Sequence, residues 1–176
     1  NANNKLITIN LINDLSSEQI VYVGIGSTVE DSYDNAISNS FAIFTVGDSL
    51  PPTVSIDAVI TASIATNSDI TFTFSEPVRN LDDTEITNLN VGSLITLKDT
   101  DANGTDLSFT ASINSAKTVI TIDPTNNFTS GQIIYAAIGA TVEDFNNNVI
   151  PATSKTFTAE YLVEDLTNPM SNKDFV

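Results

Sequence analysis

The sequence of 176 residues contains no cysteine, no histidine and no tryptophan, and its single methionine is Met170. These absences exclude disulfides, thiolate chemistry, imidazole bases and the commonest zinc ligands together. Serines are plentiful, but no histidine is present to activate one as the nucleophile of a usual catalytic triad. We therefore expect that the protein is not an enzyme.

Basic side chains are also scarce. Six lysines and arginines stand against 22 aspartates and glutamates, which gives a formal net charge of −16. Such a charge repels nucleic acid phosphates and anionic lipids and attracts cations. No apolar run approaches the ~18 residues of a membrane span. We expect neither a nucleic acid partner nor insertion into a membrane.

The sequence is nevertheless 41% hydrophobic, enough to bury a core. Its apolar residues alternate with polar ones, as in Ile70, Phe72 and Phe74, which is the period of half-buried strands. Asn, Asp, Gly, Ser and Thr clusters separate seven predicted strands, at about 53–57, 69–74, 91–98, 106–113, 117–123, 132–138 and 154–161. The pattern predicts an all-β protein with an immunoglobulin-like antiparallel sandwich, and it leaves the strand order open.

Part of the sequence occurs twice. Residues 1–48 align with residues 114–161, at a constant shift of 113 positions, with about 19 identities and no gap. The clearest stretch is QIVYVGIGSTVED (19–31), which lies over QIIYAAIGATVED (132–144). We therefore expect a tandem repeat.

Only the second copy of the repeat is whole. We assign residues 1–48 to the last three strands of one repeat, 49–161 to a complete repeat and 162–176 to a polar tail or linker. Pro51 and Pro52 mark the boundary, because consecutive prolines suit a stiff connector. Three isolated strands leave an apolar face and an edge open to water. Residues 1–48 are therefore expected to need strands from upstream sequence or from a neighbouring chain.

Three segments of the complete copy are distinctive: TFTFSEPV (71–78), the spacing P-x-x-x-F-x-S-G-Q-x-x-Y from Pro124 to Tyr135, and VEDFNNN (142–148). In them the chain resembles the bacterial Ig-like domain first described in S-layer proteins and common in large repetitive adhesins. The likeness covers about 50–161 completely and 1–48 partially. One departure is Asn147, which stands where glycine is common in the family.

The resemblance implies an extracellular spacer or adhesive module of a large bacterial cell-surface or secreted protein. Its partners are then neighbouring Ig-like repeats of the same chain or of adjacent subunits. Two alternatives stay open at this point. One is a filament subunit completed by strand complementation between chains; the other is a calcium-dependent module that binds a cell-surface glycan or protein.

The segment DTDANGTD (99–106) supplies the candidate metal site. A calcium loop needs oxygen ligands at alternate positions and a glycine at the turn. The candidate ligands are Asp99, Asp101, Asn103, the carbonyl of Thr105 and Asp106, with Ca²⁺ as a structural ion. The alternative is the polar tip of a hairpin, in which Asn103 and Gly104 adopt positive φ and the aspartates cap local amides.

Two further acidic clusters are present. Glu143, Asp144 and Asn146–Asn148 recur in the first copy at Glu30, Asp31, Asp34 and Asn35. Such residues usually form hydrogen bonds with the backbone of their own loop. If they bind a metal ion instead, Asp48 or Asp57 would join them as ligands. The second cluster comprises Glu76, Asp82, Asp83 and Glu85, with Arg79 as a partner for Glu76. A solvated face is the ordinary reading of such a run.

Overall fold

The computed structural model describes residues 6–57 and 63–160. The chain divides into two compact units, Asn1–Leu50 and Pro51–Val176. The described residues contain no helix with the length and hydrophobicity that crossing a bilayer requires. Each unit is described by itself below.

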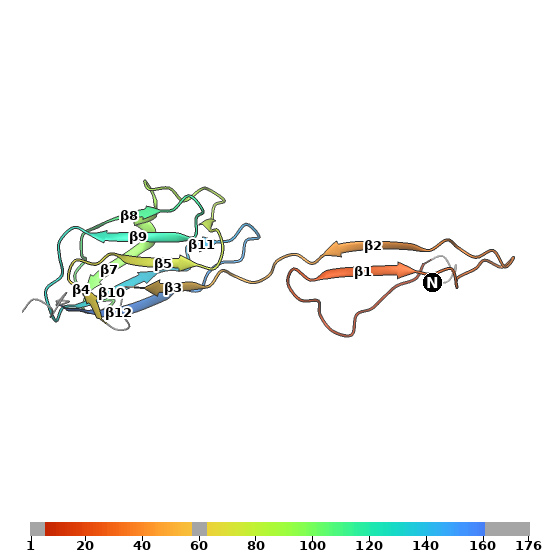
Figure 1. Ribbon diagram of the computed structural model, residues 1–176, viewed down its shortest axis with the longest axis horizontal. Helices are drawn as coiled ribbons and strands as arrows, with labels where there is room; N and C mark the ends of the chain where they lie inside the picture. The colour runs from red at the N-terminus through yellow and green to blue at the C-terminus, as the bar shows by residue number, and fades with distance from the viewer. Residues whose placement is uncertain (1–5, 58–62, 161–176) are drawn as a thin grey trace, which may run out of the picture. The chain divides into compact units, whose positions relative to one another are not determined.

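The second unit consists of short strands joined by polar turns (Figure 1). Its strands are β3 (Val54–Asp57), β4 (Ser63–Ala65), β5 (Ile70–Phe74), β6 (Arg79–Asn80), β7 (Ile95–Asp99), β8 (Phe109–Ile113), β9 (Val119–Pro124), β10 (Ile133–Ile138), β11 (Val142–Glu143) and β12 (Thr153–Glu160). A 3-10 turn, η1 (Val91–Leu94), precedes β7.

Two four-stranded sheets enclose the core of this unit. One has the order β3-β5-β9-β8 and the other β4-β12-β10-β7; β11 and β6 form a small separate pair. All pairings are antiparallel except that of β4 with β12. The alternating apolar residues of both sheets are buried, among them Phe72 of β5, Ile120 of β9, Ile134 of β10 and Phe157 of β12. The predicted all-β, immunoglobulin-like sandwich is confirmed.

The strands differ from the prediction in two respects. The segment predicted as a strand over 91–98 begins as the 3-10 turn, because polar residues before it bond locally: the Asn90 side-chain oxygen accepts from the Thr87 amide at 2.7 Å. The short strands β4, β6 and β11 were not predicted. With two or three residues each, they are too short to show an alternation.

The first unit contains β1 (Ile20–Ile25) and β2 (Ser40–Thr45), which pair antiparallel. The register joins Ile20 to Thr45 and Ile25 to Ser40. A shift of 113 positions turns these pairs into Ile133 with Thr158 and Ile138 with Thr153, the register of β10 with β12. The sequence likeness between the two segments therefore extends to strand pairing.

Residues 6–10 of the first unit form no strand, although a third strand was expected in 1–48. Their equivalents in the second unit belong to β9, which lies between β5 and β8. The first 50 residues contain no equivalent of either neighbour among the described positions. A strand without partners gains no ladder hydrogen bonds, which explains the difference.

Candidate functional site

The segment DTDANGTD forms a tight turn that follows β7. The Asp99 amide donates to the Thr105 carbonyl at 2.9 Å, and the Gly104 amide donates to the Asp101 carbonyl at 3.0 Å. A side chain on Gly104 would meet the Asp99 carbonyl oxygen at 1.5 Å, so only glycine fits. Neither Asn103 nor Gly104 has a positive φ; the left-handed residue is Thr100, with φ 71°. The expected positive φ at Asn103 and Gly104 was wrong, because close approach rather than handedness requires the glycine.

The three carboxylates of this loop each have a partner. Asp106 accepts from the Lys98 ammonium at 2.7 Å, Asp101 accepts from the Asn103 amide at 2.7 Å, and Asp99 accepts from the Gln132 side chain at 3.3 Å. Within the described ranges, these carboxylates form no cluster of three with oxygens inside 4.8 Å. These bonds are those of a polar hairpin tip. Calcium coordination stays a prediction, and it requires the ion to displace Lys98 from Asp106.

The segment VEDFNNN contains two buried acids: Glu143, the last residue of β11, and Asp144, which follows it. Glu143 is 5% exposed and Asp144 is 1% exposed. One oxygen of Asp144 accepts from the amides of Asn146 at 2.7 Å and Asn148 at 2.9 Å; the other accepts from the Asn148 side chain at 2.8 Å. Asn147 between them has φ 68°, a left-handed conformation that asparagine tolerates. Asp144 therefore closes its own loop, as expected for the recurring cluster.

Arg79 accompanies the other buried acid. Its guanidinium contacts Glu143 at 3.2 Å and Asp83 at 2.5 Å, and it donates to the Asn147 side-chain oxygen at 2.9 Å. It also lies over the Phe145 ring, 5.5 Å from the centroid. Arg79 thus supplies the positive charge that a buried carboxylate such as Glu143 needs as a partner. Sequence reasoning did not find the pair, because the register of β6 with β11 brings Arg79 opposite Glu143.

The first unit repeats the Asp144 loop in an exposed setting. Asp31 accepts from the amides of Tyr33 at 2.8 Å and Asn35 at 3.0 Å, and from the Asn35 side chain. These bonds hold the pKa of Asp31 below its ordinary value; the Asn35 side chain has the largest effect, followed by the Asn35 and Tyr33 amides. Asp34 takes the place of Asn147, with φ 64°. The loop geometry is therefore encoded locally and does not require burial.

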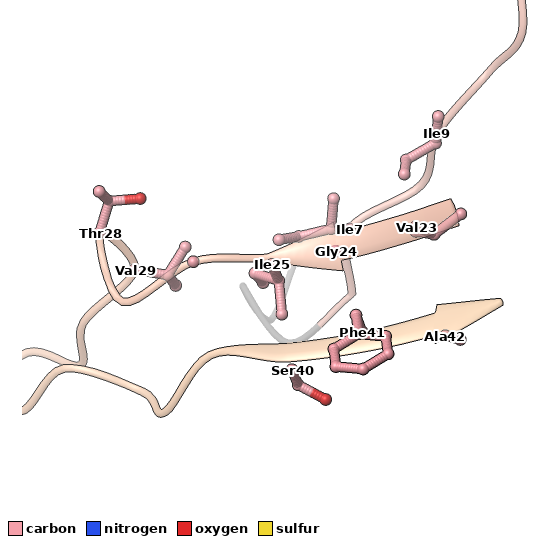
Figure 2. Close-up of a pocket in the computed structure, with 11 residues that line it drawn as sticks. Ile7, Ile9, Val23, Gly24, Ile25, Thr28, Val29, Ser40, Phe41 and Ala42 are labelled. Carbon is pink, nitrogen blue, oxygen red and sulfur yellow. The ribbon is translucent and has the colours of Figure 1, made fainter. Parts of the chain in front are cut away.

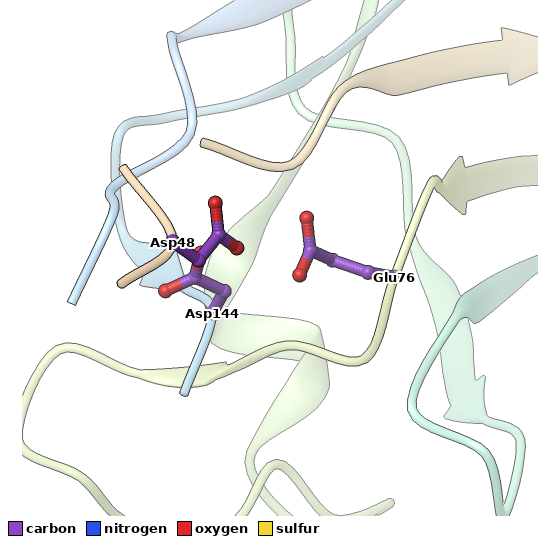
Figure 3. A group of neighbouring side chains, drawn as sticks. All are labelled: Asp48, Glu76 and Asp144. Atoms are coloured by element: carbon purple, nitrogen blue, oxygen red, sulfur yellow. The ribbon is translucent and has the colours of Figure 1, made fainter. Parts of the chain in front are cut away.

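The remaining acidic cluster is divided among separate contacts. Asp82 accepts from the Thr84 hydroxyl and amide, which lower its pKa in that order, and Glu85 pairs with Lys117 at 2.7 Å. Figure 3 shows Glu76 beside Asp144, with one carboxylate oxygen of each inside 4.8 Å.

Asp48, the third residue drawn there, belongs to the first unit. Its carboxylate accepts from the Leu50 amide at 3.0 Å and the Ser17 hydroxyl at 2.7 Å, and these bonds lower its pKa.

The architecture and these loops agree with a comparison against protein families. Residues 48–159 match the profile of the bacterial Ig-like domain. The chain belongs to this family. Bacterial Ig-like domains are generally structural modules without enzymatic activity, and they typically occur in surface-exposed or extracellular proteins. None of the curated proteins matches the chain significantly.

Proposed function

We propose that the Ig-like domain of residues 48–159 is an extracellular spacer in a tandem array of the S-layer or large adhesin type, on or released from a bacterial cell. Its task is to supply length and to resist pulling force. The observation that carries the proposal is the parallel pairing of β4, near the start of the domain, with the last strand, β12.

The chain enters and leaves this domain at opposite ends. The last strand, β12, runs parallel to β4, with Ser63 opposite Thr158 and Ala65 opposite Glu160. Just before β4, the Ile56 carbonyl of β3 accepts from the Lys155 ammonium at 2.8 Å, near the start of β12. β4 and β12 therefore advance in the same direction, and each domain adds its strand length to an array.

The same arrangement favours mechanical resistance. When the two ends are pulled apart, β4 and β12 slide along each other, so their ladder hydrogen bonds are strained together rather than one after another. Phe157 adds to this resistance, because this β12 side chain is buried between the sheets. A parallel pair of β4, near the start of the domain, and the last strand is thus suited to a module that carries tension.

The surface location is supported by family membership and by composition. Domains of this family typically occur in surface-exposed or extracellular proteins. The net charge of −16 keeps neighbouring copies apart in solution and disfavours nucleic acid partners. The repeat at 113 positions, with its identical strand register, supports an array of such domains.

Single-molecule stretching of the whole chain tests the spacer role. We expect one major unfolding event that releases the chain between Val54 and Glu160, at roughly 3.3–3.6 Å of contour length for each residue. Phe157→Ala should lower the unfolding force, whereas Phe44→Ala, the equivalent change 113 positions earlier, should not. A domain that extends without a resolvable force event would contradict the proposal.

Surface location needs a separate measurement. Antibodies raised against the second unit should label intact bacteria that make the protein, and external protease should remove the label. Labelling that appears only after the cells are broken would overturn this part of the proposal.

A further inference from the structure

The hairpin of the first unit lacks the neighbours that its counterpart has. In the second unit, β10 pairs with β7 along its other edge, and β12 pairs with β4. In the described part of the first unit, β1 and β2 form a two-stranded sheet alone. Both outer edges of this hairpin are therefore open to further strands.

The face that would form a core is also uncovered. Phe44 is 48% exposed, whereas its equivalent Phe157 is 2% exposed. The same contrast holds for Val29 at 38%, since its equivalent Val142 is fully buried. Phe44 and Val29 thus correspond in type and position to buried residues of the second unit, but no strand in the described part of the first unit covers them.

The segment before β1 shows the same contrast. Ile7 and Ile9 are 66% and 63% exposed, and their equivalents, Ile120 and Ile122, are fully buried in β9. In the second unit β5 and β8 lie on either side of that strand. Residues 6–10 thus lack two flanking strands as well.

A hollow of about 530 Å³ marks where the missing strands would pack (Figure 2). Its apolar lining comes from β2, through Phe41 and Ala42, and from five residues of the segment before β1, of β1 and of the loop after it: Ile7, Ile9, Val23, Ile25 and Val29. Each of these five has a buried equivalent in the second unit: Ile120, Ile122, Ala136, Ile138 and Val142. Most of the apolar lining of the hollow therefore corresponds to core residues of the second unit.

We propose that this surface docks a polypeptide segment with the strand pattern of residues 51–113, joined ahead of Asn1 in the same polypeptide. A strand like β7 pairs antiparallel with β1, a strand like β4 runs parallel to β2, and strands like β5 and β8 flank residues 6–10. The position of this segment ahead of Asn1 follows from the repeat. Asn1 is the equivalent of Asn114, and Asn114 directly follows Ile113, the last residue of the segment 51–113. The proposal rests on the repeat array of the proposed function and identifies what completes the first unit.

The apolar residues of that segment fit the hollow. In the second unit, the covering strands contribute Ile64, Phe72 and Leu97, all of which are at most 2% exposed. These residues pack in one cluster with Ile120, Ile134 and Phe157, whose equivalents are Ile7, Val21 and Phe44. The partner is thus recognised by apolar side chains at alternate positions together with open strand edges.

The test extends the whole chain at its N-terminus by a second copy of residues 51–113, so that its Ile113 precedes Asn1. Hydrogen exchange is then measured for the amides of β1 and β2. We expect exchange to slow at least about a hundredfold relative to the unextended chain, because the hairpin becomes part of a cooperative domain. The extended chain should remain monomeric.

Two matched controls separate docking from nonspecific collapse. An extension that carries Phe72→Asp and Leu97→Asp should leave the hairpin amides fast, since neither side chain can then enter the hollow. In the hairpin itself, Phe44→Ser should abolish the protection, whereas Ile43→Ser, on the opposite face, should preserve it.

Unchanged exchange of β1 and β2 in a soluble extended chain would overturn the proposal. Aggregation, or loss of the second unit's own melting transition, would count against it equally, because a docking segment leaves that unit intact. Protection of β1 and β2 in dimers of the unextended chain would assign the surface to a second copy instead. The spacer role is judged by stretching the unextended chain, so either proposal can fail without the other.

Discussion

At the scale of single residues, Asp31 and Asp144 show the same bonds in two environments. Both carboxylates accept from the amides two and four residues ahead and from the side chain four residues ahead. Asp31 is exposed and Asp144 is buried. Donors that lose a buried acceptor cannot turn to water, so the energetic importance of the two residues should differ.

Asp144→Ala is expected to reduce the free energy of unfolding of the second unit by about 2–4 kcal/mol, because the donors of Asn146 and Asn148 lose their acceptor. The matched control, Asp31→Ala, removes the same bonds from the exposed loop of the first unit, and it should change the free energy of unfolding measured for the whole chain by less than about 0.5 kcal/mol. Urea denaturation followed by circular dichroism measures both. Equal effects of the two substitutions would show that burial of the loop does not decide its contribution.

Asn35→Ala should raise the pKa of Asp31 toward its ordinary value, since the Asn35 side chain has the largest lowering effect. A carboxyl whose pKa is lowered on folding stabilises the folded loop above the unfolded pKa, near 3.9, and this contribution is lost as the pH falls through the lower folded value. Carbon-detected NMR titration measures the shift. Asn39→Ala, which removes a bond to the Ser27 amide only, is the control and should leave Asp31 unchanged.

The role of Asp144 could be predicted from its sequence, but that of Arg79 could not. An aspartate followed by asparagines after a strand forms local bonds, and such bonds depend only on nearby positions. Arg79 lies 64 positions before Glu143, and only the pairing of β6 with β11 joins them. With two residues each, neither strand has a recognisable pattern.

At the scale of elements, the loop of residues 99–106 tests how far a ligand pattern can predict a metal site. Asp99, Asp101 and Asn103 have the alternate spacing of a calcium loop, yet each loop carboxylate has a protein partner. Lys98 brings a positive charge to Asp106. A calcium ion and this ammonium compete for the same oxygen.

The calcium hypothesis therefore predicts that millimolar calcium raises the melting midpoint of the second unit and that a chelator lowers it. In Lys98→Met, where the competing ammonium is removed, calcium should raise the midpoint by more than in the unaltered chain. Lys117→Met, which removes an ammonium from Glu85 instead, is the matched control and should not alter the calcium response. Magnesium and sodium at equal ionic strength control for screening of the negative charge. A midpoint that calcium leaves unchanged in both variants would identify the loop as a plain turn.

The strands that were predicted share one property. β5, β9 and β10 each bury alternate residues, so the period of two is visible in the sequence. β4 has three residues and was missed, although it forms the parallel edge along β12 on which the proposed mechanics depend. Such an edge is specified by tertiary pairing rather than by local pattern.

At the scale of the whole molecule, one sequence motif occurs in a complete sandwich and in an isolated hairpin. A two-stranded hairpin is at best marginally stable in water, whereas strands within two packed sheets share the stability of the domain. The identical register of β1 with β2 and of β10 with β12 makes each amide comparable with one 113 positions away. The difference between paired positions then measures what the neighbouring strands contribute.

We expect the amides of β1 in the unextended chain to exchange at least about a hundredfold faster than those of β10, because β10 lies between β7 and β12 while β1 has only β2. Hydrogen exchange followed by mass spectrometry resolves the two segments within one sample, so pH and temperature are identical for both. Sedimentation across a range of concentrations shows whether the chain is monomeric. Equal protection of β1 and β10 in a monomer would mean that the hairpin is stable without further strands, and the exposed Phe44 would then not mark an incomplete core.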